Sequence, residues 1–155
     1  MLNEEAGVYQ ERNVDRTDVL HEYFVPTDRF TDFLDRVRTI VPSHGGDLLN
    51  VTVRDVREDK DTVLRYADRD VFGLVKLFSQ VRTSDADARM EAMTQELIDA
   101  ALECGGRYYL PYRLHATADQ FKAAYPQARK FFERKLHYDP TELFQNEFYR
   151  KYGRL

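Results

Sequence analysis

The sequence predicts an α+β domain in which helices pack on one face of an antiparallel sheet. Three observations favour this fold class. Short segments alternate apolar and polar residues as strands do, longer segments repeat apolar residues every three or four positions as helices do, and the two kinds follow a βαββαβ order before a helical C-terminus. The 155 residues suit one domain of ordinary size, and 43% of them are apolar, enough for a core.

The first two predicted elements are a strand at residues 19–26 and a helix at residues 27–41. The strand ends at a proline, and its alternation places Glu22 between two apolar residues on one face. A carboxylate in that position is costly unless it is paired or lies at an edge. Thr27 is a suitable N-cap for the helix, whose apolar residues follow the i, i+3, i+4, i+7 spacing of one buried stripe.

Two long strands, with a short hairpin strand between them, are expected before the second long helix. Residues 48–57 alternate cleanly, with Asn50 and Arg54 on the polar face and apolar residues on the other. A charged turn follows, and residues 62–66 can pair back as a hairpin strand. Residues 71–81 form the most apolar strand of the chain.

Lys76 lies inside this most apolar strand, and two interpretations stay open. The strand could lie at an edge of the sheet, where the lysine reaches water. Alternatively, the lysine could reach into a ligand site.

The second helix is expected to start at Ser84 or Asp85 and to end at Gly105–Gly106, because glycine suits a left-handed helix end. A tyrosine-rich strand follows directly, at residues 107–112. Its tyrosines either half-bury in an amphipathic strand with their hydroxyls in water, or line a pocket for a polar, hydroxyl-rich ligand.

Further helices are predicted at the C-terminus. A capping box begins at Thr117, a second start lies at Pro126, and Asp139 begins a third. The last helix is expected to bury Leu143, Phe144 and Phe148. With these additions the order matches a ferredoxin-like arrangement, whose uncovered sheet face is left for water, a partner or a ligand.

Composition excludes several classes of protein. Charged residues make up 32%, and no apolar run approaches the roughly 20 residues that span a bilayer. The N-terminus has neither the basic start nor the apolar run of a signal peptide, and the single cysteine, Cys104, fits a reducing compartment such as the cytoplasm. A net charge of −4 argues against nucleic acid as the main partner. The sequence holds no glycine-rich nucleotide loop, zinc motif or nucleophile elbow.

Several segments resemble the C-terminal half of FAD-linked oxidases of the vanillyl-alcohol-oxidase type, in the branch that oxidises sugars, alditols and aldonolactones. The strand segments are HEYFVP at 21–26, NVTVR at 50–54 and GGRYYLPY at 105–112. The ending of that family is matched in order and spacing by Tyr125-Pro126, Phe131-Phe132, Lys135, Asp139-Pro140 and Leu143-Phe144-Gln145-Asn146. The resemblance runs from about residue 17 to residue 152.

The resemblance implies that FAD and the substrate are bound by two different domains, and that this chain contains the second of them. In the family, an N-terminal domain binds FAD, and a cap domain covers the flavin ring and holds the substrate. Residues 17–155 would then be the cap, and residues 1–16 a linker or the tail of a preceding domain. The partners would be the FAD-binding domain of the same protein and a small hydroxylated substrate (a sugar, polyol or aldonolactone). This chain alone is expected to be inactive.

The resemblance also implies roles for residues of the sheet. Arg54 would hold or polarise a substrate oxygen, while Lys76 or Tyr112 would help to remove the hydroxyl proton. Substrate contacts would come from Glu22, Asn50 and Tyr109. Related members carry a lysine in an HWGK-like segment near the position of Tyr112, and that segment is missing here.

A second hypothesis belongs to another functional class. A free-standing ferredoxin-like module could bind a small ligand or form a dimer through its open sheet face, without catalysis.

Overall fold

The structure is a computed structural model that describes residues 14–154. This part of the chain forms one four-stranded antiparallel sheet in the order β2-β3-β1-β4. The strands are β1 (Arg16–Pro26), β2 (Asp47–Val56), β3 (Val71–Val81) and β4 (Arg107–Tyr108). The helices are η1 (Thr27–Arg29), α2 (Phe30–Ser43), α3 (Ser84–Glu103), α4 (Ala118–Ala124), α5 (Ala128–Tyr138) and α6 (Glu147–Tyr152). The predicted α+β class and antiparallel sheet are confirmed.

The linker expected at residues 1–16 lies mostly outside the described residues, which begin at residue 14. Where the chain is described, Arg16 already belongs to β1 and pairs with Val81 of β3. The ordered sheet therefore starts slightly earlier than the predicted first strand.

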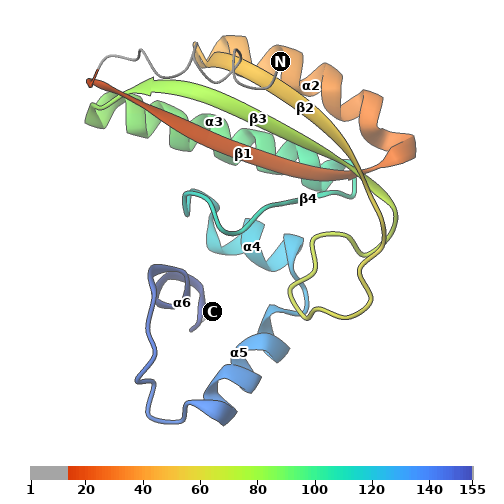
Figure 1. Ribbon diagram of the computed structural model, residues 1–155, viewed down its shortest axis with the longest axis vertical. Coiled ribbons are helices and arrows are strands. Elements are labelled where there is room, and N and C mark those ends of the chain that lie inside the picture. Colours follow the sequence, from red (N-terminus) through yellow and green to blue (C-terminus); the bar gives the residue numbers. More distant parts are fainter. Residues whose placement is uncertain (1–13, 155) are drawn as a thin grey trace, which may run out of the picture.

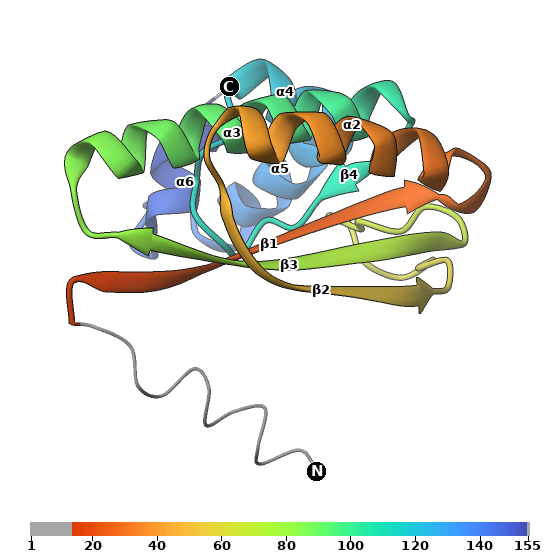
Figure 2. The same ribbon diagram turned by 90° about the horizontal axis from the view of Figure 1, so that it is seen from above.

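The two long helices, α2 and α3, lie side by side over one face of the sheet (Figure 2). The shorter helices α4, α5 and α6 lie beyond the β4 side of the sheet (Figure 1). Across β1, β2 and β3, the opposite face carries no helix in the part of the chain that the structure describes. We call this helix-free side the open face.

The main core lies between the sheet and the two long helices. Tyr23 and Val25 of β1, Phe33 of α2 and Leu97 of α3 belong to it, and each is at most 1% exposed. Complete burial of an apolar side chain of this size contributes about 1.5–3 kcal/mol. This core fixes which face of β1 points away from the helices, and so it fixes the open face.

The paired glycines work as predicted at the end of α3. Gly105 has a φ of +73°, the left-handed conformation that glycine adopts without strain. At Gly106 the space is the constraint, because a Cβ there would lie 2.5 Å from the carbonyl oxygen of Phe24. The absence of a side chain lets the chain leave α3 and come directly against β1 as β4.

The hairpin strand expected at residues 62–66 is not formed, and the chain from 57 to 70 is an irregular loop. Asp59 is one cause, since its carboxylate accepts hydrogen bonds from the backbone amides of Asp61 and Thr62. These short-range bonds compete with a strand ladder. Consequently β3 pairs with β2 and β1, and it is a central strand rather than an edge.

The apolar face predicted for β2 is only partly covered. Val51 and Val53 are 44% and 52% exposed, because β2 is the edge strand beside β3. Alternation in a sequence identifies which residues share a face of a strand, but coverage of that face depends on the position of the strand in the sheet.

Two predicted elements near the C-terminus are shorter or later than expected. β4 has only two residues, and the chain leaves the sheet after Tyr109, whose backbone amide still bonds to Glu22 of β1. The helix expected from Asp139 starts only at Glu147, because Asp139 accepts hydrogen bonds from the amides of Leu143 and Phe144 in a turn. Leu143 and Phe144 are each 75% exposed rather than buried.

Candidate functional site

Cross-strand pairing decides which predicted site residues share a face. Glu22 of β1 lies opposite Val75 of β3, and Phe24, two residues further on, lies opposite Gly73. Gly73 in turn lies opposite Arg54 of β2. Because directly paired residues point to the same side of a sheet, Glu22 and Arg54 both point to the open face, in adjacent rows.

Glu22 and Arg54 form an ion pair with unequal exposure. An Arg54 guanidinium nitrogen lies 3.5 Å from the carboxylate oxygen of Glu22. The Glu22 side chain is 7% exposed and that of Arg54 is 59% exposed. Burial raises the pKa of the Glu22 carboxyl, and Arg54 and Tyr112 oppose that rise. The site therefore holds a poorly hydrated carboxylate beside a guanidinium that still faces water.

The segment after β4 brings two tyrosines to this carboxylate. The backbone N–H of Tyr109 donates a 3.0 Å hydrogen bond to the carbonyl of Glu22, which holds the start of the segment on β1. The Tyr112 hydroxyl interacts with the Glu22 carboxylate and opposes the rise in the pKa of that carboxyl. The two tyrosine rings meet edge to face, with centroids 5.2 Å apart. Burial is the largest cause that raises the pKa of Tyr112, and the negative charge of Glu22 raises it further.

Tyr66, from the loop between β2 and β3, completes the aromatic side of the cluster. Its ring stacks on Phe24 with centroids 4.1 Å apart and meets Tyr109 edge to face at 5.5 Å. Arg107 holds this loop through a 2.7 Å ion pair to Asp68. Tyr66 was not predicted as a site residue, because residues 62–66 were expected to form a hairpin strand. Only the tertiary position of the loop that they form instead brings its ring to the sheet.

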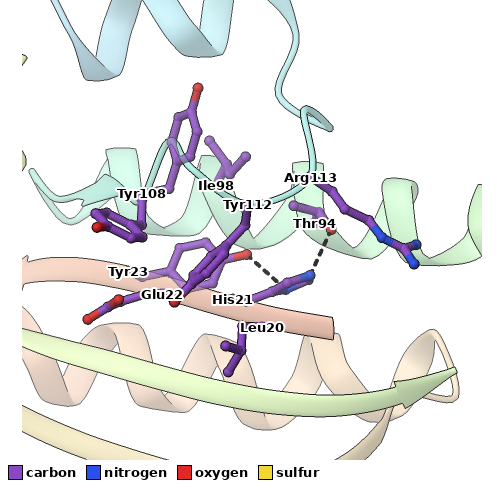
Figure 3. A pocket seen from close by; sticks show the side chains of 10 residues that line it. Leu20, His21, Glu22, Tyr23, Thr94, Ile98, Tyr108, Tyr112 and Arg113 are labelled. Atoms are coloured by element: carbon purple, nitrogen blue, oxygen red, sulfur yellow. Dashed lines mark hydrogen bonds between the residues drawn. The ribbon is translucent and has the colours of Figure 1, made fainter. Parts of the chain in front are cut away.

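A hollow opens at the edge of β1 where β4 stops (Figure 3). Glu22 and Tyr112 line its open-face side, and His21 and Thr94 line the side beneath α3. Arg113 lies at the rim, where it pairs with Asp87 at 2.9 Å. The hollow therefore joins the open-face cluster to a second polar group on the helix side of β1.

His21 belongs to that second group and has a defined protonation state. The Thr94 hydroxyl donates to the carbonyl of Met90 at 2.6 Å, so it accepts from His21 Nε2 at 3.4 Å and from His115 Nδ1 at 2.9 Å. His21 Nδ1 is left to accept from the Tyr23 hydroxyl at 3.4 Å. Burial lowers the pKa of His21 to about 3, which keeps the ring neutral. We interpret this chain of hydrogen bonds as structural.

Lys76 does not join the other predicted site residues. It pairs with His21 across β1 and β3, so it lies on the helix side of the sheet, opposite to Glu22. Its side chain is fully buried, and its Nζ lies 4.1 Å from the centre of the Tyr23 ring. Neither interpretation made from the sequence fits, because the strand is central and the amine reaches neither water nor the open face.

Asn50 lies on the open face but away from the cluster. It pairs with Leu77, which pairs with Leu20 on β1, one row before Glu22. Of the predicted site residues, the structure therefore gathers Glu22, Arg54, Tyr109 and Tyr112, leaves Asn50 at the margin and separates Lys76.

The cluster offers three chemical capabilities. A poorly hydrated carboxylate can accept a proton, an exposed guanidinium can hold an oxygen, and tyrosine rings give flat surfaces with hydroxyls at their ends. Among residues 14–154, no group of three or more His, Cys, Asp and Glu side chains could hold a metal ion. Within the same residues, no helix has both the length and the apolar character needed to cross a bilayer.

Comparison with known proteins adds no assignment: neither a protein-family model nor a curated protein matches the chain.

Proposed function

We propose that residues 17–155 form the substrate-binding cap domain of an FAD-dependent oxidoreductase that oxidises a hydroxyl-bearing substrate of the sugar, polyol or aldonolactone type. The observation that carries the proposal is the convergence of Glu22, Arg54 and Tyr112 on one uncovered sheet face. They come from β1, β2 and the segment after β4. A carboxylate is rarely kept 7% exposed without a strong partner unless its altered proton affinity is used.

The strand order supports the finer description of the fold as ferredoxin-like. The order β2-β3-β1-β4, with α2 and α3 on one face, is the expected outcome of a βαββαβ chain whose strands are all antiparallel. We infer that α4, α5 and α6 are additions to this arrangement.

The open face has the character of a lid. Leu20 is 39% exposed, and Val75 and Leu77 beside it are half-buried although no helix covers them. An aliphatic surface next to a polar cluster suits contact with a flat ring and its substrate. The described residues supply such a surface, whereas a flavin would be held by the domain that precedes the cap and, when bound, would accept the hydride.

The residues of the cluster then have separate tasks. Arg54 is exposed enough to donate to the substrate oxygen while it keeps its contact with Glu22. As the carbon–hydrogen bond breaks and the hydride leaves, the hydroxyl proton passes to the Glu22 carboxylate, directly or through the Tyr112 hydroxyl. The product is a carbonyl compound. Lys76 has no part in this scheme, because it lies on the other side of the sheet.

The proposal is tested on the full-length gene product that contains this chain. We expect that product to carry flavin absorbance near 450 nm and to reduce the flavin with a sugar, a polyol or an aldonolactone. Arg54→Ala should lower turnover by about 100-fold, the scale measured for loss of one oxygen-binding donor, while flavin content stays unchanged. Arg129→Ala, on the exposed surface of α5, is the matched control. A full-length product without flavin would contradict the proposal.

The second candidate is the non-catalytic module, favoured by the same half-exposed aliphatic side chains. If Leu20, Val75 and Leu77 instead form an interface between two copies, the isolated chain should be a dimer in light scattering, and Leu77→Asp should return it to a monomer. A monomer that gains no mass at high concentration would exclude this candidate.

A further inference from the structure

The amine of Lys76 is buried between the central strand β3 and the helices, and it has no hydrogen-bond partner among the described residues. Lys76 is 0% exposed, and no acceptor bonds to its Nζ among the described residues. Its neighbours across the strands are His21 on β1 and Val51 on β2. A lysine side chain normally places its ammonium group in water or against a carboxylate, and here it does neither.

The groups that face Nζ from each neighbouring element supply no negative charge. Tyr23 of β1 and Phe33 of α2 present their rings, with centroids 4.1 and 5.2 Å from Nζ. The titratable neighbours are His21 and Tyr23 of β1, and burial keeps both uncharged by lowering the pKa of His21 and raising that of Tyr23. No carboxylate from β2, α2 or α3 affects the Lys76 amine, whose pKa burial alone lowers to about 7.

The aromatic rings only partly replace water around a charged amine. A cation over a ring is attracted by its negative face, but the loss of hydration of a buried ammonium group is the larger effect. A neutral amine avoids most of that cost. The protonation state of Lys76 should therefore matter to the contact between Phe33 of α2 and Tyr23 of β1, which is one of the contacts that hold α2 on the sheet.

We propose that Lys76 makes the packing of α2 on the sheet sensitive to pH: the helix packs fully while the amine is neutral and loosens when the amine takes up a proton. The sign follows from linkage. The unfolded chain keeps its lysine protonated up to about pH 10.4, whereas the folded chain releases the proton near pH 7. The unfolded state thus binds more protons between these values, and stability rises with pH across that window.

Urea unfolding of the wild-type chain and of Lys76→Met tests the proposal between pH 6 and pH 9.5. Methionine is an unbranched side chain one atom shorter than lysine, and it cannot be protonated. We expect the variant to have the higher urea midpoint at pH 6, with the difference shrinking steadily toward pH 9.5. Lys130→Met, on the exposed side of α5, should leave the wild-type profile unchanged. A variant that is less stable than wild type by the same amount at every pH would overturn the proposal.

Hydrogen exchange locates the effect and does not depend on the variant folding. After correction for intrinsic rates, protection of the α2 amides should fall by about tenfold or more between pH 8.5 and pH 6, as a protonation near pH 7 requires. Amides of α5 should change much less. Equal changes in the two helices would contradict a local role for Lys76.

Discussion

At the scale of single residues, the environment of Glu22 sets the chemistry of the open face. Its carboxylate is nearly buried although no helix covers it, because Tyr109 and Tyr112 from the segment after β4 lie against it. Among the described residues, the guanidinium that pairs with this carboxylate is that of Arg54. Its nitrogen lies 3.5 Å from the carboxylate oxygen, and its side chain is exposed to water. Such a weak pair leaves the carboxylate with an increased affinity for protons, which suits a group that receives one.

The increased pKa of Glu22 predicts a stability effect of unusual sign for a carboxylate. The unfolded chain loses this proton near pH 4.3, and the folded chain keeps it to a higher pH. The contribution is therefore fully present below pH 4.3 and is lost as pH rises through the folded pKa. Glu22→Gln should raise the free energy of unfolding at pH 7, because it removes a charge that burial destabilises. The gain should be about 1 kcal/mol or less, because water around the exposed Arg54 screens the charges at this site.

The measurement is urea unfolding at pH 4 and pH 7, with Glu133→Gln on the exposed surface of α5 as the control. A Glu22→Gln variant that loses stability at pH 7 would show that the Arg54 pair outweighs burial.

Tyr112 allows a second prediction at this scale. Tyr112→Phe removes the hydroxyl but keeps the ring that packs on Tyr109 at 5.2 Å. In the full-length enzyme it should lower kcat by about 100-fold with little change in KM, if the hydroxyl assists proton transfer. Tyr138→Phe, whose side chain is 84% exposed, is the control. An unchanged kcat would restrict Tyr112 to a packing role.

At the scale of elements, the helices and strands that neighbouring residues determine were predicted correctly, whereas features that depend on tertiary contacts were not. The bounds of α3 agree with the start predicted at Ser84 or Asp85 and with the end predicted at the paired glycines, and β3 agrees with the strand predicted from one apolar run. The alternation of β1 gave the right face for Glu22. The prediction of a strand at residues 62–66 was wrong, because Asp59 holds the amides of Asp61 and Thr62 in a turn. The burial of Lys76 could not be predicted, since it depends on which helix covers which strand.

Gly106 gives a test at the scale of elements. A Cβ at Gly106 would lie 2.5 Å from the carbonyl oxygen of Phe24, so Gly106→Ala should push β4 off β1 and cost about 3 kcal/mol or more. Gly105→Ala is the matched control, because its Cβ would approach nothing closer than Pro26 at 3.8 Å and meets only the strain of a positive φ. That strain should cost about 1 kcal/mol. Thermal unfolding of both variants measures the difference, and equal losses would contradict the close-approach argument.

At the scale of the whole molecule, the proposed function depends on the uncovered side of the sheet. The long helices cover one side, and the other carries Glu22, Arg54 and Tyr112 beside half-exposed aliphatic residues (Figures 1 and 2). The sequence predicted a free face and named Glu22, Arg54 and Tyr112 for its site. It did not predict Tyr66, which reaches this face from a loop outside the regular strands. We propose that a flavin-binding domain covers this side.

Hydroxyl-radical footprinting can detect this coverage, by comparing this chain alone with the flavin-loaded full-length gene product. We expect Leu20, Leu77 and Tyr112 to be oxidised in the isolated chain and protected in the full-length protein, while Tyr138, which is 84% exposed on α5, is oxidised in both. Equal oxidation of the three open-face residues in both samples would show that no domain covers this side of the sheet.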